Sequence, residues 1–177
     1  MNKKYLTDYE KRQTLKPDGG VGYELVYIGK HFRFQSSEKR LRRRRLALLS
    51  LTVLATAFCL LPCFFNFALL RVPYLSLPQV LTLFPLFHLW LGVIGFCLYP
   101  EPLTRERRDK TEGRIALCSF LCGVFLSLVG VCGAVLWHIG GYDGVELTFC
   151  ASVLLSGACS FSVFFLRDGA RCVEDKG

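Results

Sequence analysis

One histidine inside a long apolar stretch is the first residue to consider for chemistry. His88 lies near the middle of residues 75–99, a segment without Asp, Glu, Lys or Arg. An ionisable group at that depth in a membrane is a candidate proton relay or ligand contact. The sequence therefore offers His88, with Gln79 in the same segment, as a candidate intramembrane polar site. The alternative is a neutral histidine that hydrogen-bonds a Ser, a Thr or a backbone carbonyl.

Two cysteine pairs are the second possible source of chemistry. Cys59/Cys63 and Cys118/Cys122 each have the i, i+4 spacing that puts two ligands on one helical face. Counted from the basic residues that flank each apolar segment, the first pair lies deeper than the second, so we do not expect a shared ion. We predict that the cysteines pack as small apolar side chains, with no metal and no cofactor.

The sequence contains no recognisable catalytic set. There is no Ser-His-Asp arrangement, no pair of catalytic carboxylates, no phosphate-binding loop and no histidine cluster. We therefore name no catalytic residue, and we favour a protein that is not an enzyme.

Four apolar blocks must position these side chains. Each is longer than the roughly 20 residues that an α-helix needs to cross a bilayer. We therefore predict an all-α integral membrane protein, an antiparallel bundle of four transmembrane helices over residues 38–167. An N-terminal segment (residues 1–37) precedes the bundle and a tail (residues 168–177) follows it. The predicted spans are residues 46–70, 75–99, 114–139 and 145–166.

A dense group of cations stands directly before the first block. Residues 1–45 contain thirteen Lys/Arg and five Asp/Glu, and the rest of the chain contains nine of each, so the net charge of +8 arises before the first span. Such a group marks a membrane boundary. It explains the charge without a nucleic-acid partner, and it predicts contact with an anionic inner leaflet; a specific lipid-sensing role is the alternative. The cations of this basic collar are Lys39, Arg40, Arg42, Arg43, Arg44 and Arg45.

The distribution of Lys and Arg also predicts an orientation. The connections after the first and third spans contain one and none, whereas the N-terminal segment, the second connection and the tail contain thirteen, five and three. By the positive-inside rule both termini are cytoplasmic. Because the loops are short and no targeting feature is present, we expect a multi-pass protein of a bacterial plasma membrane.

The N-terminal segment is predicted to contain a small β-hairpin near residues 23–34. Gly29 and Lys30 suit a two-residue turn, and we expect no fixed structure in the first fifteen or so residues. This register places four apolar side chains on one face, which the membrane interface, the second connection or another chain must cover. The residues of this candidate docking face are Leu25, Tyr27, Phe32 and Phe34.

Rows of small residues predict close helix packing within the bundle. Spans three and four contain Gly130-xxx-Ala134 and Ser152-xxx-Ser156-xxx-Ser160, patterns that allow helices to approach. We expect these two spans to pair, with self-association through one such row as the alternative.

Three functions remain compatible with the sequence. The first is a non-catalytic accessory or interaction component of a membrane complex, which docks through the uncovered hairpin face. The second is a small oligomeric transporter or channel that uses His88 and Gln79. The third and least favoured is a membrane thiol enzyme.

Overall fold

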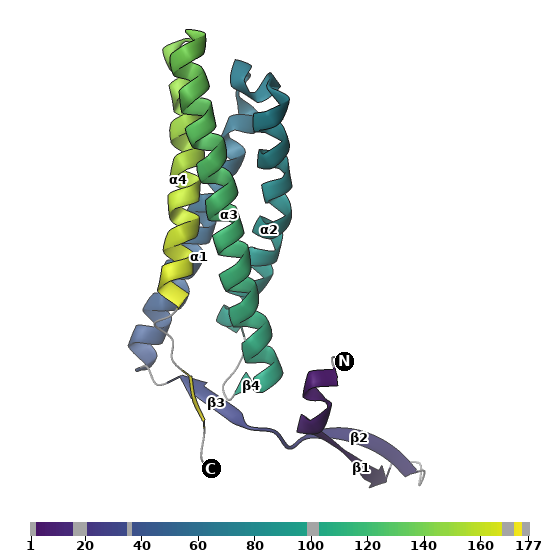
Figure 1. Cartoon of the computed structure of the whole chain (residues 1–177). Helices are drawn as coiled ribbons and strands as arrows, with labels where there is room; N and C mark the ends of the chain where they lie inside the picture. The colour runs from purple at the N-terminus through teal and green to yellow at the C-terminus, as the bar shows by residue number, and fades with distance from the viewer. Residues whose placement is uncertain (1–2, 16–20, 35–36, 99–102, 168–171, 175–177) are drawn as a thin grey trace.

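The computed structural model describes residues 3–15, 21–34, 37–98, 103–167 and 172–174. Its four long helices are α1 (Glu38–Leu60), α2 (Pro73–Leu98), α3 (Arg105–Gly140) and α4 (Gly144–Arg167). They run up and down in a single bundle, with the strands gathered beneath one end (Figure 1). Each helical segment is long and apolar enough to cross a membrane, so the predicted four-helix membrane architecture is confirmed at this level.

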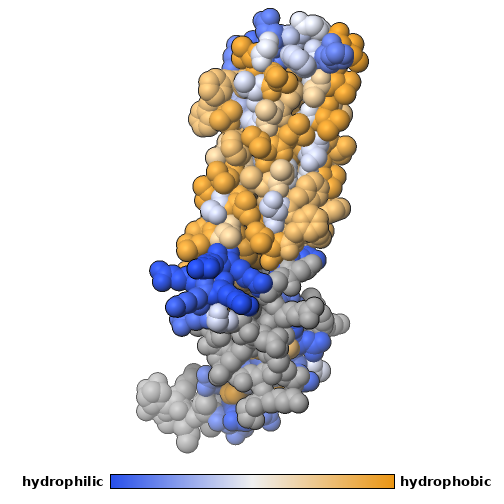
Figure 2. Space-filling model, turned by 90° about the vertical axis from the view of Figure 1, so that its left-hand side faces the viewer, coloured by the Kyte–Doolittle hydropathy of each residue, from blue (hydrophilic) through white to orange (hydrophobic). Residues whose placement is uncertain are grey.

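The surface of the bundle agrees with that architecture. Figure 2 shows a hydrophobic band along the helices and a strongly hydrophilic cluster at one end. We call the end that carries the collar, the start of α3 and the strands the basic end. The other end, with the α1–α2 and α3–α4 connections, is the opposite end.

The first helix ends earlier than its apolar block. Two short 3-10 turns follow α1, η2 (Leu61–Phe64) and η3 (Ala68–Arg71). Pro62 at the start of η2 has no backbone N–H to continue the α-helix. The apolar block 46–70 is therefore not one continuous α-helix, because its last part forms the connection to α2.

The third helix is longer than its predicted span. α3 begins at Arg105, where the backbone N–H of Arg107 donates to Thr104 Oγ1 at 3.4 Å. It ends at Gly141, whose φ of 62° is the left-handed conformation typical of a helix C-cap. Residues 105–114 are charged and extend α3 past the ends of its neighbours at the basic end (Figure 1).

Glycines allow α3 and α4 to pack closely. A methyl group added at Gly130 would lie 2.6 Å from Leu154 Cγ, and one at Gly157 would lie 2.9 Å from Ser127 Oγ. The expected pairing of these helices is thereby confirmed. The serine row of α4 behaves differently, because Ser156 Oγ donates to the carbonyl of Ala55 in α1 at 2.6 Å.

Two small sheets lie beneath the basic end. A hairpin pairs β1 (Tyr9–Leu15) with β2 (Val21–Tyr27), and a 3-10 turn, η1 (Lys3–Asp8), precedes it. The second sheet has β3 (His31–Phe34) in the centre, between β4 (Leu103–Thr104) and β5 (Cys172–Glu174). Segments from the N-terminus, the α2–α3 connection and the C-terminal tail therefore meet here.

The predicted pairing within residues 23–34 is wrong, although a hairpin exists. Tyr27 lies opposite Tyr9 rather than Phe32. The amides of Ile28 and Gly29 donate to the carbonyl of Asp8 at 2.9 and 3.2 Å, so they close no turn between β2 and β3. The sequence of β1 is mostly polar and lacks the apolar alternation by which a strand is recognised.

Two further expectations concern the ends of the chain. The segment expected to lack fixed structure forms η1 and β1. Within the predicted tail, Cys172–Glu174 pairs with β3, and the remaining tail residues lie outside those described.

Candidate functional site at the basic end

The basic collar is divided between two environments. Leu41 and Leu48 are buried, and Arg44 and Arg45 lie between them on the same side of α1, half-buried against the bundle. The guanidinium carbon of Arg45 is 6.0 Å from the centroid of the Phe96 ring, within range of a cation–π contact. The exposed cations are Lys39, Arg40, Arg42 and Arg43.

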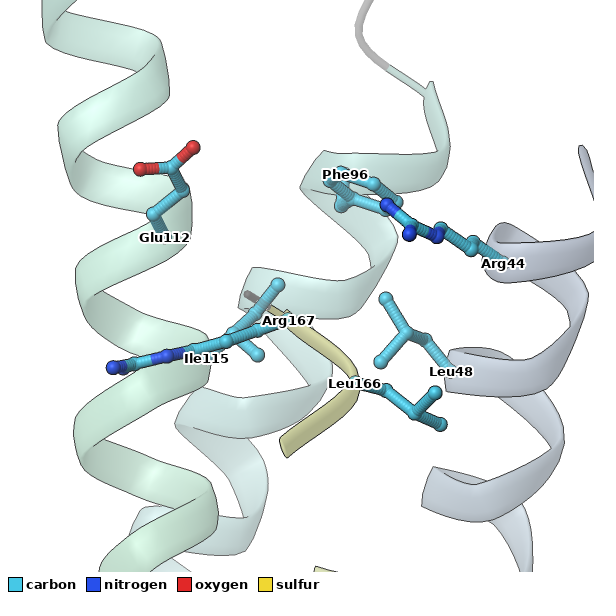
Figure 3. A pocket seen from close by; sticks show the side chains of 7 residues that line it. All are labelled: Arg44, Leu48, Phe96, Glu112, Ile115, Leu166 and Arg167. Atoms are coloured by element: carbon cyan, nitrogen blue, oxygen red, sulfur yellow. The ribbon is translucent and has the colours of Figure 1, made fainter. Parts of the chain in front are cut away.

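A small cavity lies beside the two half-buried arginines, between side chains from all four helices (Figure 3). Its volume of about 20 Å³ holds one water molecule but no organic ligand. The Arg44 Nη1 and Arg45 Nε atoms are buried and make no hydrogen bond within the described residues. The cavity can therefore hold a water molecule at the basic end of the bundle, but it is too small to be a ligand-binding site. Its lining residues are Arg44, Leu48, Phe96, Glu112, Ile115, Leu166 and Arg167.

Three tyrosines attach the N-terminal segment to the start of α3. Tyr5 Oη donates to Asp109 Oδ2 at 3.1 Å, and Tyr9 Oη donates to Glu106 Oε2 at 3.2 Å. We call Tyr5, Tyr9 and Tyr27 the tyrosine latch.

Tyr27 completes the latch from β2. Its hydroxyl accepts from the backbone N–H of Arg105 at 3.1 Å and donates to the carbonyl of Lys30 at 2.9 Å. Its ring packs edge-on against that of Tyr9, with centroids 5.2 Å apart. Because an amide at the start of a helix has no partner within the helix, Tyr27 satisfies one of the open donors of α3.

The Tyr9 hydroxyl is suited to act as a donor. Burial, reinforced by the neighbouring Glu106 carboxylate, raises the pKa of Tyr9 above its ordinary value. Tyr9 therefore remains a protonated donor to Glu106 throughout the physiological pH range.

The four residues of the predicted docking face do not share a face. Leu25 and Tyr27 lie two positions apart on β2, whereas Phe32 and Phe34 belong to β3 in the other sheet. Tyr27 is occupied by the latch, and Phe32 lies 4.8 Å from the guanidinium carbon of Arg108. Leu25 remains 53% exposed, and the side chain of Phe34 lies outside the described part. The chain itself therefore contacts two of these four residues, Tyr27 and Phe32.

The far half of the hairpin projects away from the bundle (Figure 1). We call its residues 11–15 and 21–25 the hairpin arm. Tyr23 and Leu25 point to the same side of the arm as the latch residues Tyr9 and Tyr27, and Tyr23 is 70% exposed. The arm therefore presents apolar side chains that the described chain does not cover.

His88 lies on the outer surface of the bundle. It is half-buried, in the row of α2 that includes the exposed Leu81, Phe84 and Leu91. Its ring contacts those of Phe84 and Phe87, and Nδ1 lies 3.1 Å from the carbonyl of Phe84. This arrangement corresponds to the alternative of a histidine bonded to a backbone carbonyl.

Gln79 faces the interior instead. It is 4% exposed, and its Nε2 donates to the carbonyl of Cys59 in α1 at 3.2 Å. Its Oε1 has no hydrogen-bond partner within the described residues. Gln79 and His88 thus point to different sides of α2 and form no common polar site.

The two cysteine pairs differ in exposure. Cys59, Cys118 and Cys122 are buried, whereas Cys63 is exposed beyond the end of α1. In the described part of the chain, no three His, Cys, Asp or Glu side chains gather as ligands for a metal ion.

A buried carboxylate at the opposite end was missed by sequence reasoning. Glu146 is 7% exposed, and its two oxygens accept from the backbone N–H groups of Ala68 at 2.6 Å and Leu69 at 3.3 Å. It thereby caps η3 and fixes the α1–α2 connection against α4. The signal in the sequence is a single acidic residue in the first turn of an apolar helix, which does not reveal its partners.

Comparison of the chain with protein-family models, curated proteins and solved structures finds no match.

Proposed function

We propose that this chain is a non-catalytic, multi-pass membrane protein that serves as an accessory or interaction component of a membrane complex. The observation that supports this function is the hairpin arm, which is attached to α3 by the tyrosine latch and carries Tyr23 and Leu25 exposed. A lone two-stranded hairpin is marginally stable in water, so fixing it to a helix favours a role in contact.

The arm offers two means of binding. Each of its strands has one edge that no described strand pairs, and an open edge can accept a strand from another protein. Tyr23 and Leu25 supply apolar contact on one face, which they share with Lys11 and Gln13 of β1, while Arg12 and Glu24 lie on the other face. We propose that a partner protein adds a strand to the arm and covers Tyr23 and Leu25.

The basic end faces the cytoplasm in this proposal. The excess of Lys and Arg in the segments at that end supports this orientation, and the bacterial plasma membrane remains the expected location. Labelling with a membrane-impermeant thiol reagent tests the orientation in intact cells. A variant with Cys172 as its only cysteine should stay unlabelled until the cells are opened. A variant whose only cysteine is Ile139→Cys should react from outside, and the reverse pattern would refute the orientation.

A crosslinking pull-down from native membranes tests the docking function. The tagged full-length chain should retain one reproducible partner. Leu25→Lys should weaken that capture about tenfold or more, because it places a charge in an apolar contact. Glu24→Lys is the matched control, since it adds a lysine on the same strand but on the opposite face of the arm.

Two outcomes would refute docking through the arm. One is equal capture by wild-type and Leu25→Lys protein. The other is crosslinking only to further copies of the same chain, which would indicate self-association.

A further inference from the structure

A polar groove between the latch and α3 extends up to the apolar surface of α2. Its volume of about 390 Å³ is sufficient for the polar headgroup of a lipid. It is open to the surface, and Leu91, which is 42% exposed, forms its apolar border. We call it the α3 groove. Its lining residues are Tyr9, Leu91, Glu106, Arg107, Lys110, Thr111 and Arg114.

Three cations form a column along this groove. Arg107, Lys110 and Arg114 recur at i, i+3 and i+7, so they lie on one face of α3 over about 10 Å of helix. The acidic residue of the lining, Glu106, is 2.5 Å from Lys110 Nζ and also accepts from Tyr9. The groove therefore carries a net positive charge.

The other carboxylates near the groove are engaged by other groups. Asp109 accepts from Tyr5, and Glu112 lies 3.4 Å from Arg108 Nε. Arg114 is exposed and forms no ion pair within the described part of the chain. An anionic ligand would therefore meet little competition at the upper end of the groove.

Depth in the membrane distinguishes Arg114 from the collar. A methyl group added at Gly92 would lie 3.3 Å from Arg114 Cβ, so these residues share one level. Five residues further along α2, Cys97 Sγ approaches the carbonyl of Arg45 at 3.9 Å. Arg114 thus lies about 7 Å further into the apolar bundle than the last collar residue.

An exposed arginine at that level, beside the exposed apolar side chain of Leu91, is well placed to contact an anion at the membrane boundary. Guanidinium and ammonium groups bind phosphate through charge-assisted hydrogen bonds. A phospholipid matches the groove along its whole length, because its phosphate would meet the column of cations and its acyl chains would follow Leu91 along α2. We propose that the α3 groove binds the headgroup of an anionic phospholipid. The proposal does not rest on docking through the hairpin arm, although the groove shares Tyr9 and Glu106 with the attachment of the latch.

Lipid titration of the purified full-length chain tests the proposal. Native mass spectrometry in detergent would measure retention of phosphatidylglycerol against phosphatidylcholine. Wild-type protein should retain phosphatidylglycerol preferentially, and Arg107→Gln/Lys110→Gln/Arg114→Gln should weaken that binding about tenfold or more, since each cation near an anionic lipid contributes up to about fivefold in affinity. The matched control is Arg40→Gln/Arg42→Gln/Arg43→Gln, which removes the same charge from exposed collar positions and should retain most of the binding.

Additional variants and a competitor make the test decisive. If circular dichroism shows that the triple α3 variant is unfolded, Arg114→Gln should still weaken binding a few-fold and Arg114→Lys should restore most of it. Soluble glycerol phosphate should not displace the lipid at equal concentration, because it lacks the acyl chains. Equal loss in the two triple variants, equal retention of both lipids, or displacement by glycerol phosphate would each overturn the proposal.

Discussion

The two ends of the bundle satisfy their polar groups in different ways. At the opposite end, the Glu146 carboxylate binds backbone amides of the α1–α2 connection and is almost inaccessible to solvent. At the basic end, Asp109 and Glu106 bind tyrosine hydroxyls of an N-terminal segment that is far away in sequence. One end is closed by a buried charge, and the other is held by part-buried side-chain contacts.

This difference suggests that the opposite end stabilises the bundle, whereas the basic end is available for binding. A buried carboxylate bonded to backbone amides has few alternatives, so it fixes a single geometry. Part-buried hydroxyl–carboxylate bonds contribute less to the free energy of unfolding than a buried charge bonded to backbone amides. We therefore expect mutations at the opposite end to affect unfolding of the bundle, and mutations at the basic end to affect binding.

The largest effect is expected for Glu146→Ala. The substitution leaves two backbone donors at the start of η3 without an acceptor, at a cost of about 3 kcal/mol. Thermal unfolding in detergent would measure the loss of stability. The control is Asp143→Ala, which removes an exposed carboxylate three residues earlier, in the α3–α4 connection. Equal stability of the two variants would show that the opposite end is not closed by this carboxylate.

A somewhat smaller effect is expected for Gly157→Leu, in the contact between α4 and α3 midway along the bundle. A side chain there meets Ser127 Oγ and the backbone of α3, and overpacking of this kind costs about 2 kcal/mol. Ala158→Leu, on the exposed side of α4, should change stability little. If Gly157→Leu were neutral in the same unfolding experiment, the close contact between α3 and α4 would be contradicted.

The smallest effect is expected for Tyr27→Phe at the basic end. Loss of one exposed latch hydroxyl should cost about 1 kcal/mol and should leave unfolding of the bundle unchanged. Hydrogen exchange should accelerate in β1 and β2 alone, whereas Tyr23→Phe should leave it unaltered. Faster exchange throughout the helices would mean that the latch supports the whole bundle, and the contrast between the ends would fail.

The sequence predicts the helices better than their ends. Apolar length and composition identify four segments able to cross a membrane. The connection after α1 depends on Pro62 and on Glu146, whose carboxylate binds Ala68 and Leu69 from more than seventy residues away. Local pattern carries no information about that pairing.

The candidate site was less predictable for the same reason. Tyr5, Tyr9 and Tyr27 contact α3 across separations of 104, 97 and 78 residues. The polar sequence of β1 gives no strand signal, so its pairing with β2 could not be predicted. The predicted turn at Gly29 relied on local preference, but the amides there bind Asp8 instead. His88 was correctly placed in an apolar helix, although its side of that helix depends on the packing of α2 against α1 and α3.

Site-specific photo-crosslinking in native membranes tests the contrast between the ends most directly. A photoreactive phenylalanine analogue would replace either Tyr23 on the hairpin arm or Ile139 at the opposite end, residues that are 70% and 76% exposed. We predict a discrete protein adduct from position 23 and none from position 139. A discrete adduct from position 139 alone would contradict the assignment of function to the basic end.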